Sequence, residues 1–187
     1  MFIDKLKQSP VIAGIRNLSD VSLALEKKVN VLFIIKGDIF DLIKVKEQLS
    51  SLDVLLFAHM ELIEGVARDK AGVSFLGRKI GIDGILTTHA NLIKFAKKEG
   101  LIAVQRLFVL DSEALKTGIE VMQSCKPDAV EILPGIILPN LKEDIKNLNF
   151  PPIIAGGLIR TCEDVKKILE AGALAVSTSK KELWGRF

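Results

Sequence analysis

Short apolar runs alternate with amphipathic segments along the whole 187-residue chain. Most apolar runs are unbroken and do not alternate with polar residues, which is typical of strands covered on both faces. Their length of five to seven residues and their flanking Gly, Pro and Asp residues favour strands over buried helices. The strands predicted in this way are 10–15, 31–35, 54–59, 84–88, 102–108, 129–133, 152–157 and 174–179.

The segments between these strands carry the start and stop signals of helices. Side chains that accept hydrogen bonds from backbone N–H groups precede several segments, and Gly follows others. The helices predicted are 20–28, 38–52, 67–78, one ending near 98–100, one capped by 111–112 and ending before 126, 138–148, one capped by Thr161 and ended by Gly172, and a short helix after strand 174–179.

Eight strand–helix units without a linker predict an α/β fold, a single compact TIM-type (β/α)8 barrel of parallel strands spanning residues 1–187 as one domain. An open, doubly wound parallel sheet is the alternative. We favour the barrel because the count reaches eight and because no strand has the polar character of a sheet edge.

Composition narrows the class of protein. Hydrophobic residues make up 49% of the chain, which excludes a disordered polypeptide. The net charge of +3 permits a nucleic-acid partner without requiring one. With one Trp and no Tyr, a large aromatic platform for bases is not expected.

The chain carries no pattern that points to a membrane or to secretion. No run reaches the roughly 20 apolar residues of a membrane span, and the first residues do not resemble a signal peptide. Cys125 and Cys162 lack metal-type spacing and are interpreted as reduced thiols. We therefore expect a cytoplasmic protein, and an oligomer is compatible with the sequence.

Candidate binding residues follow from the barrel, because such barrels bind ligands where strands end and helices begin. His59 and Glu61 share a strand face and can both point into the barrel mouth. A polar layer that merely fills the mouth is the alternative. The full candidate set is Lys36, His59, Glu61, Thr88, Gln105, Arg106, Glu131, Gly156, Gly157, Ser177 and Thr178, and we expect Lys36, Thr88, Gln105 and Glu131 to point inward.

The last two strand ends carry the most specific signal. Gly156 and Gly157 let the backbone approach a ligand closely, and Ser177, Thr178 and Ser179 precede a predicted helix start. Backbone N–H groups at a helix start suit an anion, and barrels often bind phosphate after strands seven and eight. The pattern predicts a site for phosphate or a similar anion.

Other chemistries find less support. His59 and His89, the only histidines, could join Glu61 and Glu131 around a metal, but no spacing is diagnostic. Ser177 has no evident His partner, and Lys36 is more simply an ion-pair residue than a Schiff-base lysine. We predict no catalytic residue, no metal and no cofactor.

Basic residues gather at predicted helix ends, on the face opposite the mouth. Cations there compensate the helix dipole, which is the simpler interpretation. A basic rim for nucleic acid is the alternative. The residues are Lys27, Lys28, Arg78, Lys79, Lys97 and Lys98.

Three blocks of sequence resemble those of a known protein family. Gln105-Arg106-Leu107-Phe108, Glu131-Ile132-Leu133-Pro134-Gly135 and Ile154-Ala155-Gly156-Gly157-Leu158-Ile159 are specific in combination. Further matching stretches are 10–13, 59–63, 84–85, 111–112, 127–128, 171–173, 175–179 and 183–184. Through these blocks the chain resembles the glycerol uptake operon antiterminator regulatory proteins.

The resemblance implies a regulatory barrel that binds glycerol-3-phosphate and leader mRNA and lets transcription pass a terminator. Two positions depart from the pattern expected of that family: Glu61 stands where Asp is expected, and Thr87-Thr88-His89 replaces a Ser-Thr-Lys block. Loss of that lysine removes a positive charge from one strand end.

The leading hypothesis is a ligand-responsive antiterminator. In it, Gly156, Gly157, Ser177 and Thr178 hold the phosphate, Glu131, His59 and Gln105 bond the hydroxyls, and Arg106 or Lys36 adds positive charge. One alternative is an isomerase or lyase acting on a small phosphorylated metabolite with Glu131 or Glu61 as base. Another is a metabolite sensor that contacts a second protein.

Overall fold

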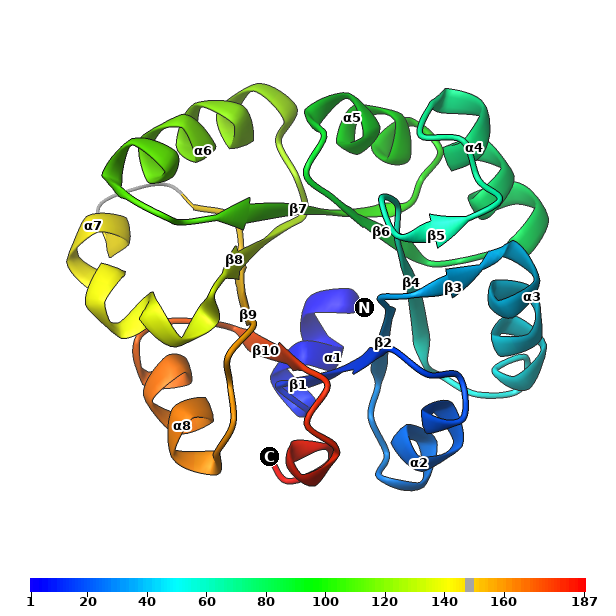
Figure 1. The fold of residues 1–187 in the computed structure, drawn as a ribbon, viewed down its shortest axis with the longest axis horizontal. Helices are drawn as coiled ribbons and strands as arrows, with labels where there is room; N and C mark the ends of the chain where they lie inside the picture. The colour runs from blue at the N-terminus through cyan, green and yellow to red at the C-terminus, as the bar shows by residue number, and fades with distance from the viewer. Residues whose placement is uncertain (147–149) are drawn as a thin grey trace.

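Eight parallel strands close into a barrel in the computed structural model, which describes residues 1–146 and 150–187 (Figure 1). Around the barrel the order is β1-β10-β9-β8-β7-β6-β4-β2, so each strand pairs with its neighbours along the chain. The strands are β1 (Val11–Ile15), β2 (Val31–Ile34), β4 (Leu55–His59), β6 (Gly84–Thr87), β7 (Ile102–Phe108), β8 (Ala129–Leu133), β9 (Ile153–Gly156) and β10 (Ala175–Thr178). The barrel prediction is confirmed, and the open sheet is excluded.

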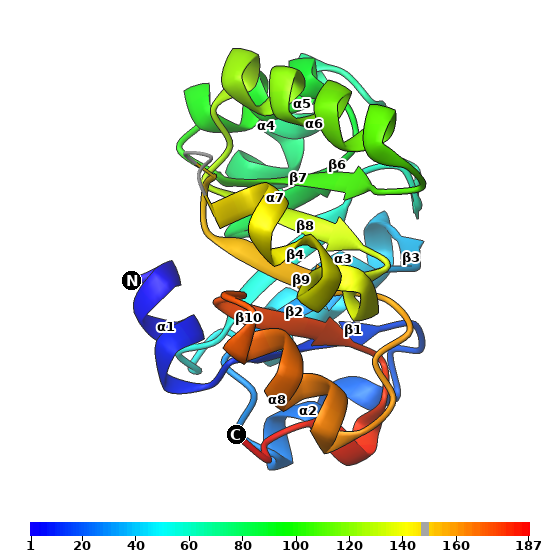
Figure 2. The same cartoon turned by 90° about the vertical axis from the view of Figure 1, so that its left-hand side faces the viewer.

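Helices cover the outside of the barrel (Figures 1 and 2). They are α2 (Asp20–Glu26), α3 (Ile39–Gln48), α4 (Lys70–Phe75) continued by the π-helical turn η1 (Leu76–Ile80), α5 (Ala90–Lys98), α6 (Ser112–Cys125), the 3-10 helix η2 (Gly135–Leu141) followed by α7 (Lys142–Lys146), α8 (Cys162–Glu170) and the 3-10 turn η3 (Lys181–Leu183). No helix in the described ranges is long and apolar enough to cross a membrane.

Three helices differ from the prediction for identifiable reasons. The segment expected to form a helix at 138–148 begins as 3-10 helix, and Pro139 lies inside it. Its last two residues lie outside the described part of the chain. The helix expected at 38–52 ends at Gln48, with Leu49 as its C-cap. The short helix expected after the last strand is a single 3-10 turn, η3, so its dipole is small.

The helix starts lie at the carboxyl end of the barrel, and side chains cap α3, α4, α6 and α8. Asp38 accepts a hydrogen bond from the backbone N–H of Asp41, and Asp69 accepts one from Gly72. Thr161 caps α8 in a reciprocal capping box with Asp164. Asp38, Asp69 and Asp111 therefore satisfy backbone donors at the starts of helices.

A helix that is not among those predicted, α1 (Phe2–Gln8), closes the amino end of the barrel (Figure 2). Phe2 and Leu6 are buried in the same cluster as Phe33 and Phe57 inside the barrel. The ring centroids of Phe2 and Phe57 lie 5.2 Å apart. The barrel interior is thus apolar at this end and closed to solvent, which leaves the opposite end as the mouth.

A second unexpected element shapes that mouth. The short strands β3 (Gly37–Asp38) and β5 (Ile63–Glu64) pair in parallel outside the barrel sheet. They tie the loop after β2 to the loop after β4. This two-stranded ladder builds a raised wall on one side of the mouth.

Replacing Leu6 with Ala tests whether α1 closes the barrel. Leu6 is fully buried, so the truncation leaves a cavity and should lower the free energy of unfolding by about 2–5 kcal/mol. Leu52→Ala is the control, because Leu52 is 45% exposed and should change stability by less than about 0.5 kcal/mol. Urea unfolding measures both, and equal effects would show that α1 does not seal the barrel.

Candidate functional site

A layer of polar side chains lies directly above the apolar interior. Along each strand the inward positions alternate, so the residues two beyond the buried Phe57, Val104, Ala129 and Ala175 also point inward. Those residues are His59, Arg106, Glu131 and Ser177. Four strands thereby bring four polar side chains to one level of the mouth.

The centre of this layer is an ion pair between β7 and β8. Arg106 and Glu131 are register partners, and Nε of Arg106 lies 2.5 Å from Oε2 of Glu131. The hydroxyl of Ser177 donates to Oε1 of Glu131 at 2.5 Å. Glu131 is only 1% exposed, so these two donors satisfy a carboxylate that would otherwise be buried without a partner.

Gly156 on β9 leaves the room that this carboxylate needs. A Cβ atom at position 156 would lie 2.5 Å from Oε1 of Glu131 and 2.6 Å from Oγ of Ser177. Any side chain there would displace the hydrogen bond between them. The role of Gly156 is therefore to make space beside the ion pair.

His59 extends the layer to β4. Nη1 of Arg106 contacts Nε2 of His59. A guanidinium only donates, so Nε2 is the acceptor and the proton of a neutral imidazole sits on Nδ1. That Nδ1 lies 3.2 Å from Oε2 of Glu61, but neither atom makes a hydrogen bond within the described structure. His59 and Glu61 are thus neighbours whose facing atoms lack partners.

Glu61 is held mainly through its other oxygen. Oε1 accepts from the hydroxyl of Thr87, from the backbone N–H of Thr88 at 3.0 Å and from Nδ1 of His89 at 2.8 Å. Burial opposes the charged form, but the hydrogen bonds and the nearby His59 outweigh it and hold the pKa of Glu61 well below its usual range. Glu61 is therefore an anion at neutral pH.

Two hollows open at the mouth of the barrel. The first mouth cavity has a volume of about 180 Å³ and is lined by Gly14, Arg16, Ile35, Arg106, Glu131, Leu133, Gly157, Leu158, Ile159, Ser177, Thr178, Ser179 and Lys180. The second mouth cavity has a volume of about 610 Å³ and is lined by Arg16, Ile35, Lys36, Glu61, Leu62, Ile63, Glu64, Gly65, Val66 and Arg68. Arg16 and Ile35 belong to both walls.

The predicted site residues divide between these hollows. Arg106, Glu131, Gly157, Ser177 and Thr178 line the first mouth cavity. Lys36 and Glu61 line the second. His59 and Gly156 lie beneath the mouth, in contact with Arg106 and Glu131 respectively. Most of the candidate set is therefore brought together, but around two cavities where the sequence suggested one.

Gln105 lies elsewhere, and the expectation that it points into the barrel is wrong. Its Nε2 donates to the carbonyl of Thr88 at 2.8 Å, and its Oε1 lies 3.8 Å from Sγ of Cys125 on α6. Adjacent strand residues face opposite sides, so with Arg106 pointing inward Gln105 must face the helices. Thr88 is exposed and contacts Glu61, and it lines a groove beside α6 with Gln105, outside both mouth cavities.

Sequence reasoning missed three residues of the mouth. Arg16 directly follows β1, and its position two residues after Gly14 marks it as a strand-end side chain. Lys180 follows Ser179 at the end of β10, and Arg68 follows β5. A strand-end survey that included the first strand would have found Arg16, whereas Arg68 depends on the unexpected β3–β5 ladder.

The basic helix ends opposite the mouth are partly engaged within the chain. Arg78 pairs with Glu99 at 2.6 Å, and Lys97 pairs with Asp128 at 2.7 Å. Nζ of Lys27 donates to the carbonyl of Lys181 at 2.8 Å. Lys28, Lys79 and Lys98 are exposed. Half of this predicted RNA surface therefore already has partners.

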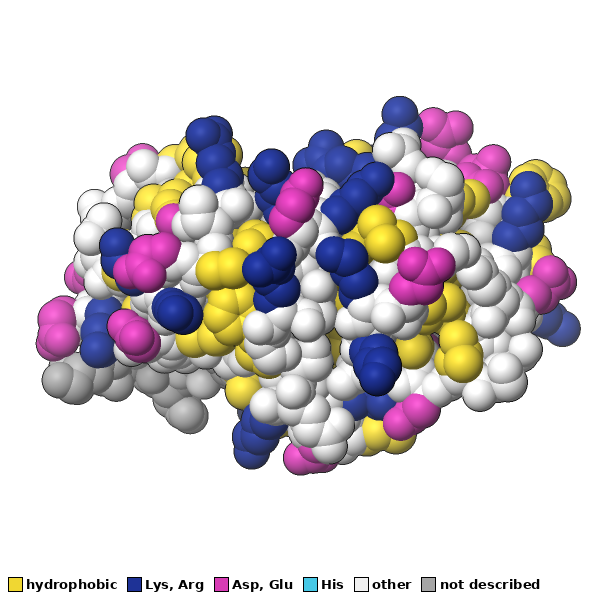
Figure 3. All heavy atoms as spheres, turned by 90° about the horizontal axis from the view of Figure 1, so that it is seen from below, with side chains coloured by type: hydrophobic (Ala, Val, Ile, Leu, Met, Phe, Trp, Pro, Cys, Tyr) yellow, Lys and Arg dark blue, Asp and Glu magenta, His cyan; other side chains and the backbone are white. Residues whose placement is uncertain are grey.

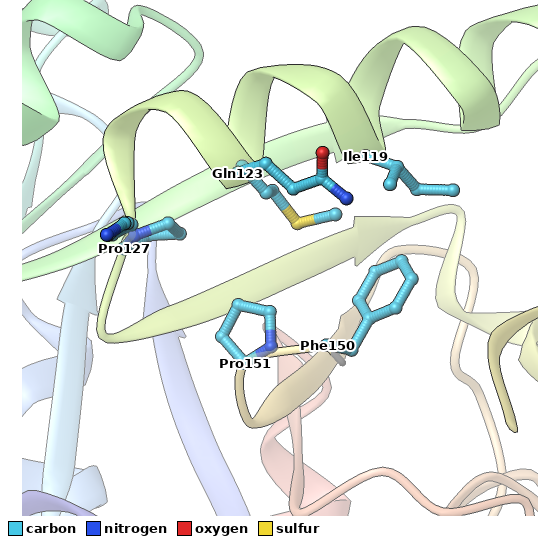
Figure 4. A pocket seen from close by; sticks show the side chains of 7 residues that line it. Ile119, Gln123, Pro127, Phe150 and Pro151 are labelled. Carbon is cyan, nitrogen blue, oxygen red and sulfur yellow. The ribbon is translucent and has the colours of Figure 1, made fainter. Parts of the chain in front are cut away.

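Outside the mouth, an apolar groove of about 430 Å³ runs beside the end of α6 (Figure 4). Ile119, Met122, Gln123, Lys126, Pro127, Phe150 and Pro151 line it. Among the described residues, no group of three or more His, Cys, Asp or Glu side chains could hold a metal ion.

Comparisons of the sequence and of the structure with known proteins point to the same family. A family model described as glycerol-3-phosphate responsive antiterminator matches residues 11–184. The crystal structure of a glycerol uptake operon antiterminator regulatory protein from Listeria monocytogenes is 33% identical, covers 96% of both chains and superposes with a TM-score of 0.88. A related antiterminator structure from Thermotoga maritima is 32% identical over 93% of this chain and 96% of that one, with a TM-score of 0.82.

Other relatives say less about function. The uncharacterized protein YgcP of Escherichia coli strain K12 is 30% identical over 179 residues, which are 96% of this chain and 93% of that protein. Solved aldolases, and an epimerase that is 19% identical, share the barrel at low identity, so they show the fold alone.

The lowered pKa of Glu61 predicts how the stability of the protein depends on pH. A carboxyl group with a lowered pKa stabilises the fold fully above its ordinary value of 4.5, and this contribution is lost as pH falls toward the folded-state value. Glu61→Gln should therefore lower the free energy of unfolding by about 1–3 kcal/mol at pH 6, and the difference should shrink from about pH 4 downward.

Denaturant unfolding between pH 3 and pH 6 measures this difference. Glu64→Gln is the matched control, because Glu64 is exposed on the same wall and should show no such trend. A difference for Glu61→Gln that stays constant across this range would contradict the assigned hydrogen bonding.

Proposed function

Because this chain belongs to the family of glycerol-3-phosphate responsive antiterminators, we propose that its first mouth cavity binds glycerol-3-phosphate and that the ligand-bound barrel binds a leader mRNA. The observation that carries the proposal is the composition of that cavity. Exposed cations, backbone donors and a fixed carboxylate converge on one small hollow. Such a set suits a small phosphorylated polyol.

The phosphate end of the ligand is assigned to the loops after β9 and β10. Gly157 and Leu158 have positive φ angles of 83° and 60°. Among the described residues, the backbone N–H groups of Gly157, Leu158 and Ser179 have no hydrogen-bond partner. Arg16 and Lys180 add positive charge to the same cavity, and both are exposed. Backbone donors together with cations are the usual way of binding a phosphate.

Thr178 is assigned to shaping this loop. Its hydroxyl accepts from the backbone N–H of Lys180 at 3.1 Å, and its carbonyl accepts from Nε1 of Trp184 at 2.9 Å. These bonds fix the turn that presents Ser179 and Lys180 to the cavity. The phosphate contacts then come from the backbone and from charged neighbours.

The polyol end is assigned to the ion-paired layer. Glu131 and Ser177 line the cavity and offer hydroxyl-binding oxygens, and Arg106 contributes its guanidinium. His59 lies beneath the cavity and accepts a hydrogen bond from Arg106, so it positions the Arg106 side chain. Gln105 faces α6 and is left out of the proposed contacts.

The bound ligand would act by shifting the barrel toward a state that binds RNA. A ligand shifts such an equilibrium only by its differential affinity for the two states. An antiterminator meets its transcript as the transcript is made, which supports the expected cytoplasmic location.

The alternative is an enzyme acting on a phosphorylated metabolite, because aldolases share this fold. A Schiff-base aldolase needs a lysine beside the bound carbonyl. In the described chain, the one lysine that lines the first mouth cavity is Lys180, an exposed residue on the loop after β10. This placement supports the regulator over the enzyme.

Thermal unfolding with and without ligand tests the sensor. Glycerol-3-phosphate at one hundred times its Kd should stabilise the fold by about 2.7 kcal/mol, which is several degrees in Tm. Glycerol at the same concentration should have no comparable effect, since it lacks the charge that the loops receive. A concentration of about 10 mM glycerol-3-phosphate is far above the Kd of a specific ligand. An unchanged Tm at that concentration would refute ligand binding.

Lys180 provides a matched pair of variants. Lys180→Gln should weaken glycerol-3-phosphate binding about ten-fold, because it removes a cation from the cavity wall. Lys166→Gln removes the same charge from the exposed side of α8 and should leave the affinity unchanged. Calorimetric titration measures both, and equal affinities for the two variants would exclude Lys180 from the site.

A further inference from the structure

The proposed function assigns no ligand to the second mouth cavity. Its volume of about 610 Å³ lies within the roughly 300–1,000 Å³ of typical ligand pockets, whereas the first mouth cavity, at about 180 Å³, suits a smaller molecule. We propose that the second mouth cavity binds one unpaired nucleotide of the RNA. This inference rests on the proposed function, in that it assumes an RNA partner.

The charges of the cavity fit a phosphate of the RNA backbone. Arg16 and Lys36 are exposed and have no ion pair or hydrogen bond within the described residues. Arg68 donates one bond from Nη2 to the carbonyl of Glu61 at 2.7 Å, which aims its guanidinium along the wall. These three cations outnumber the two carboxylates of the wall, Glu61 and Glu64, so the lining keeps a net positive charge that attracts phosphates without regard to sequence.

The remaining wall fits a base. Leu62 is 47% exposed and lines the cavity together with Ile35 and Val66, so a flat apolar face would cover surface that is now open to water. RNA-binding proteins read unpaired bases by contact with their faces and by hydrogen bonds to their edges. Glu64 is exposed on the same wall and offers a carboxylate acceptor. An acceptor selects bases that carry an exocyclic amino group.

The cations continue across the mouth. Lys180 lines the first mouth cavity, Arg16 lines both, and Lys36 lines the second. Figure 3 shows the side of the barrel below the view of Figure 1, where Lys and Arg side chains gather along the edge nearest the mouth. An RNA strand can therefore follow basic residues from one cavity to the next, whereas half of the helix-end cations opposite are engaged within the chain.

The two cavities also share a chain of polar contacts. Oε2 of Glu131 bonds to Arg106, Arg106 contacts Nε2 of His59, and Nδ1 of His59 lies 3.2 Å from Oε2 of Glu61. Glu61 is a wall residue of the second mouth cavity. A ligand that rearranges Arg106 thus acts, through His59, on Glu61 in the wall of the proposed nucleotide site. This arrangement supplies a physical route by which the effector alters RNA affinity.

The test begins with RNA selected from a random single-stranded pool on the full-length protein in the presence of glycerol-3-phosphate. Three double variants are then titrated with the selected RNA. Lys36→Gln with Arg68→Gln removes two cations of the second mouth cavity. Lys79→Gln with Lys98→Gln removes two cations from the helix ends opposite the mouth. Lys44→Gln with Lys166→Gln is the control and removes two exposed cations that belong to neither of these surfaces.

We expect the first pair to weaken RNA binding about ten-fold or more and to lower the slope of log affinity against log salt by about 0.7 per cation. The other two pairs should change affinity less than two-fold. Normal RNA binding by the first pair, or a larger loss in the helix-end pair, would overturn the nucleotide site while leaving the proposed function standing. Failure of the wild-type protein to enrich any RNA would overturn both.

Cross-linking of the wild-type protein keeps the test independent of folding in the variants. The selected RNA, made with 4-thiouridine, should cross-link to peptides that contain Leu62 or Val66. Cross-links confined to the helix ends at Lys79 and Lys98 would overturn the site. A ten-fold loss of glycerol-3-phosphate affinity in Lys36→Gln with unchanged RNA binding would also overturn it, because the cavity would then belong to the small ligand.

Discussion

The buried ion pair between Arg106 and Glu131 is the constraint around which the mouth of this barrel is built. A carboxylate that is 1% exposed must be matched by donors, and the guanidinium must be matched in turn. The hydroxyl of Ser177 donates a hydrogen bond to the second carboxylate oxygen of Glu131, and His59 accepts one from the guanidinium of Arg106. Removing one partner from such a pair commonly destabilises a protein by about 3–5 kcal/mol, since the other charge is left buried alone.

The mouth holds two hollows. The ion pair lines a small hollow beside the last two strand ends, and Arg16 and Ile35 are shared with a larger hollow beside the β3–β5 ladder. The small hollow has backbone donors and suits a compact anion, while the larger one combines cations with apolar wall. A single short barrel, closed by α1 at its other end, can in this way present two different surfaces side by side. The two hollows share Arg16 and Ile35, so a ligand in one hollow meets side chains that also line the other.

The sequence was sufficient for the barrel because each strand is a self-contained apolar run whose neighbours along the chain are its neighbours in the sheet. It was also sufficient for Glu131 and Ser177, which lie two residues beyond the buried Ala129 and Ala175. It could not decide between Gln105 and Arg106, because both preceding residues, Ala103 and Val104, are apolar and either parity is consistent with a buried strand.

Other features depend on contacts between distant segments. The β3–β5 ladder involves two residues in each strand, too few to leave a periodic signal, yet it forms the wall that carries Arg68. The pairing of Arg78 with Glu99 joins different helices and could not be read from helix-end composition. By contrast, α1 did leave a signal: Phe2 and Leu6 lie four residues apart, which is the spacing of one helical face.

The central claim is that one mouth holds an effector and an RNA at adjoining, coupled positions. Thermodynamic linkage makes the claim measurable, because if glycerol-3-phosphate tightens RNA binding by some factor, RNA must tighten glycerol-3-phosphate binding by the same factor. Calorimetric titration of glycerol-3-phosphate into the protein, alone and saturated with selected RNA, measures that factor directly. The account predicts a Kd for glycerol-3-phosphate at least about five-fold lower with RNA bound, the lower end of typical coupling. Identical affinities in the two titrations would contradict it.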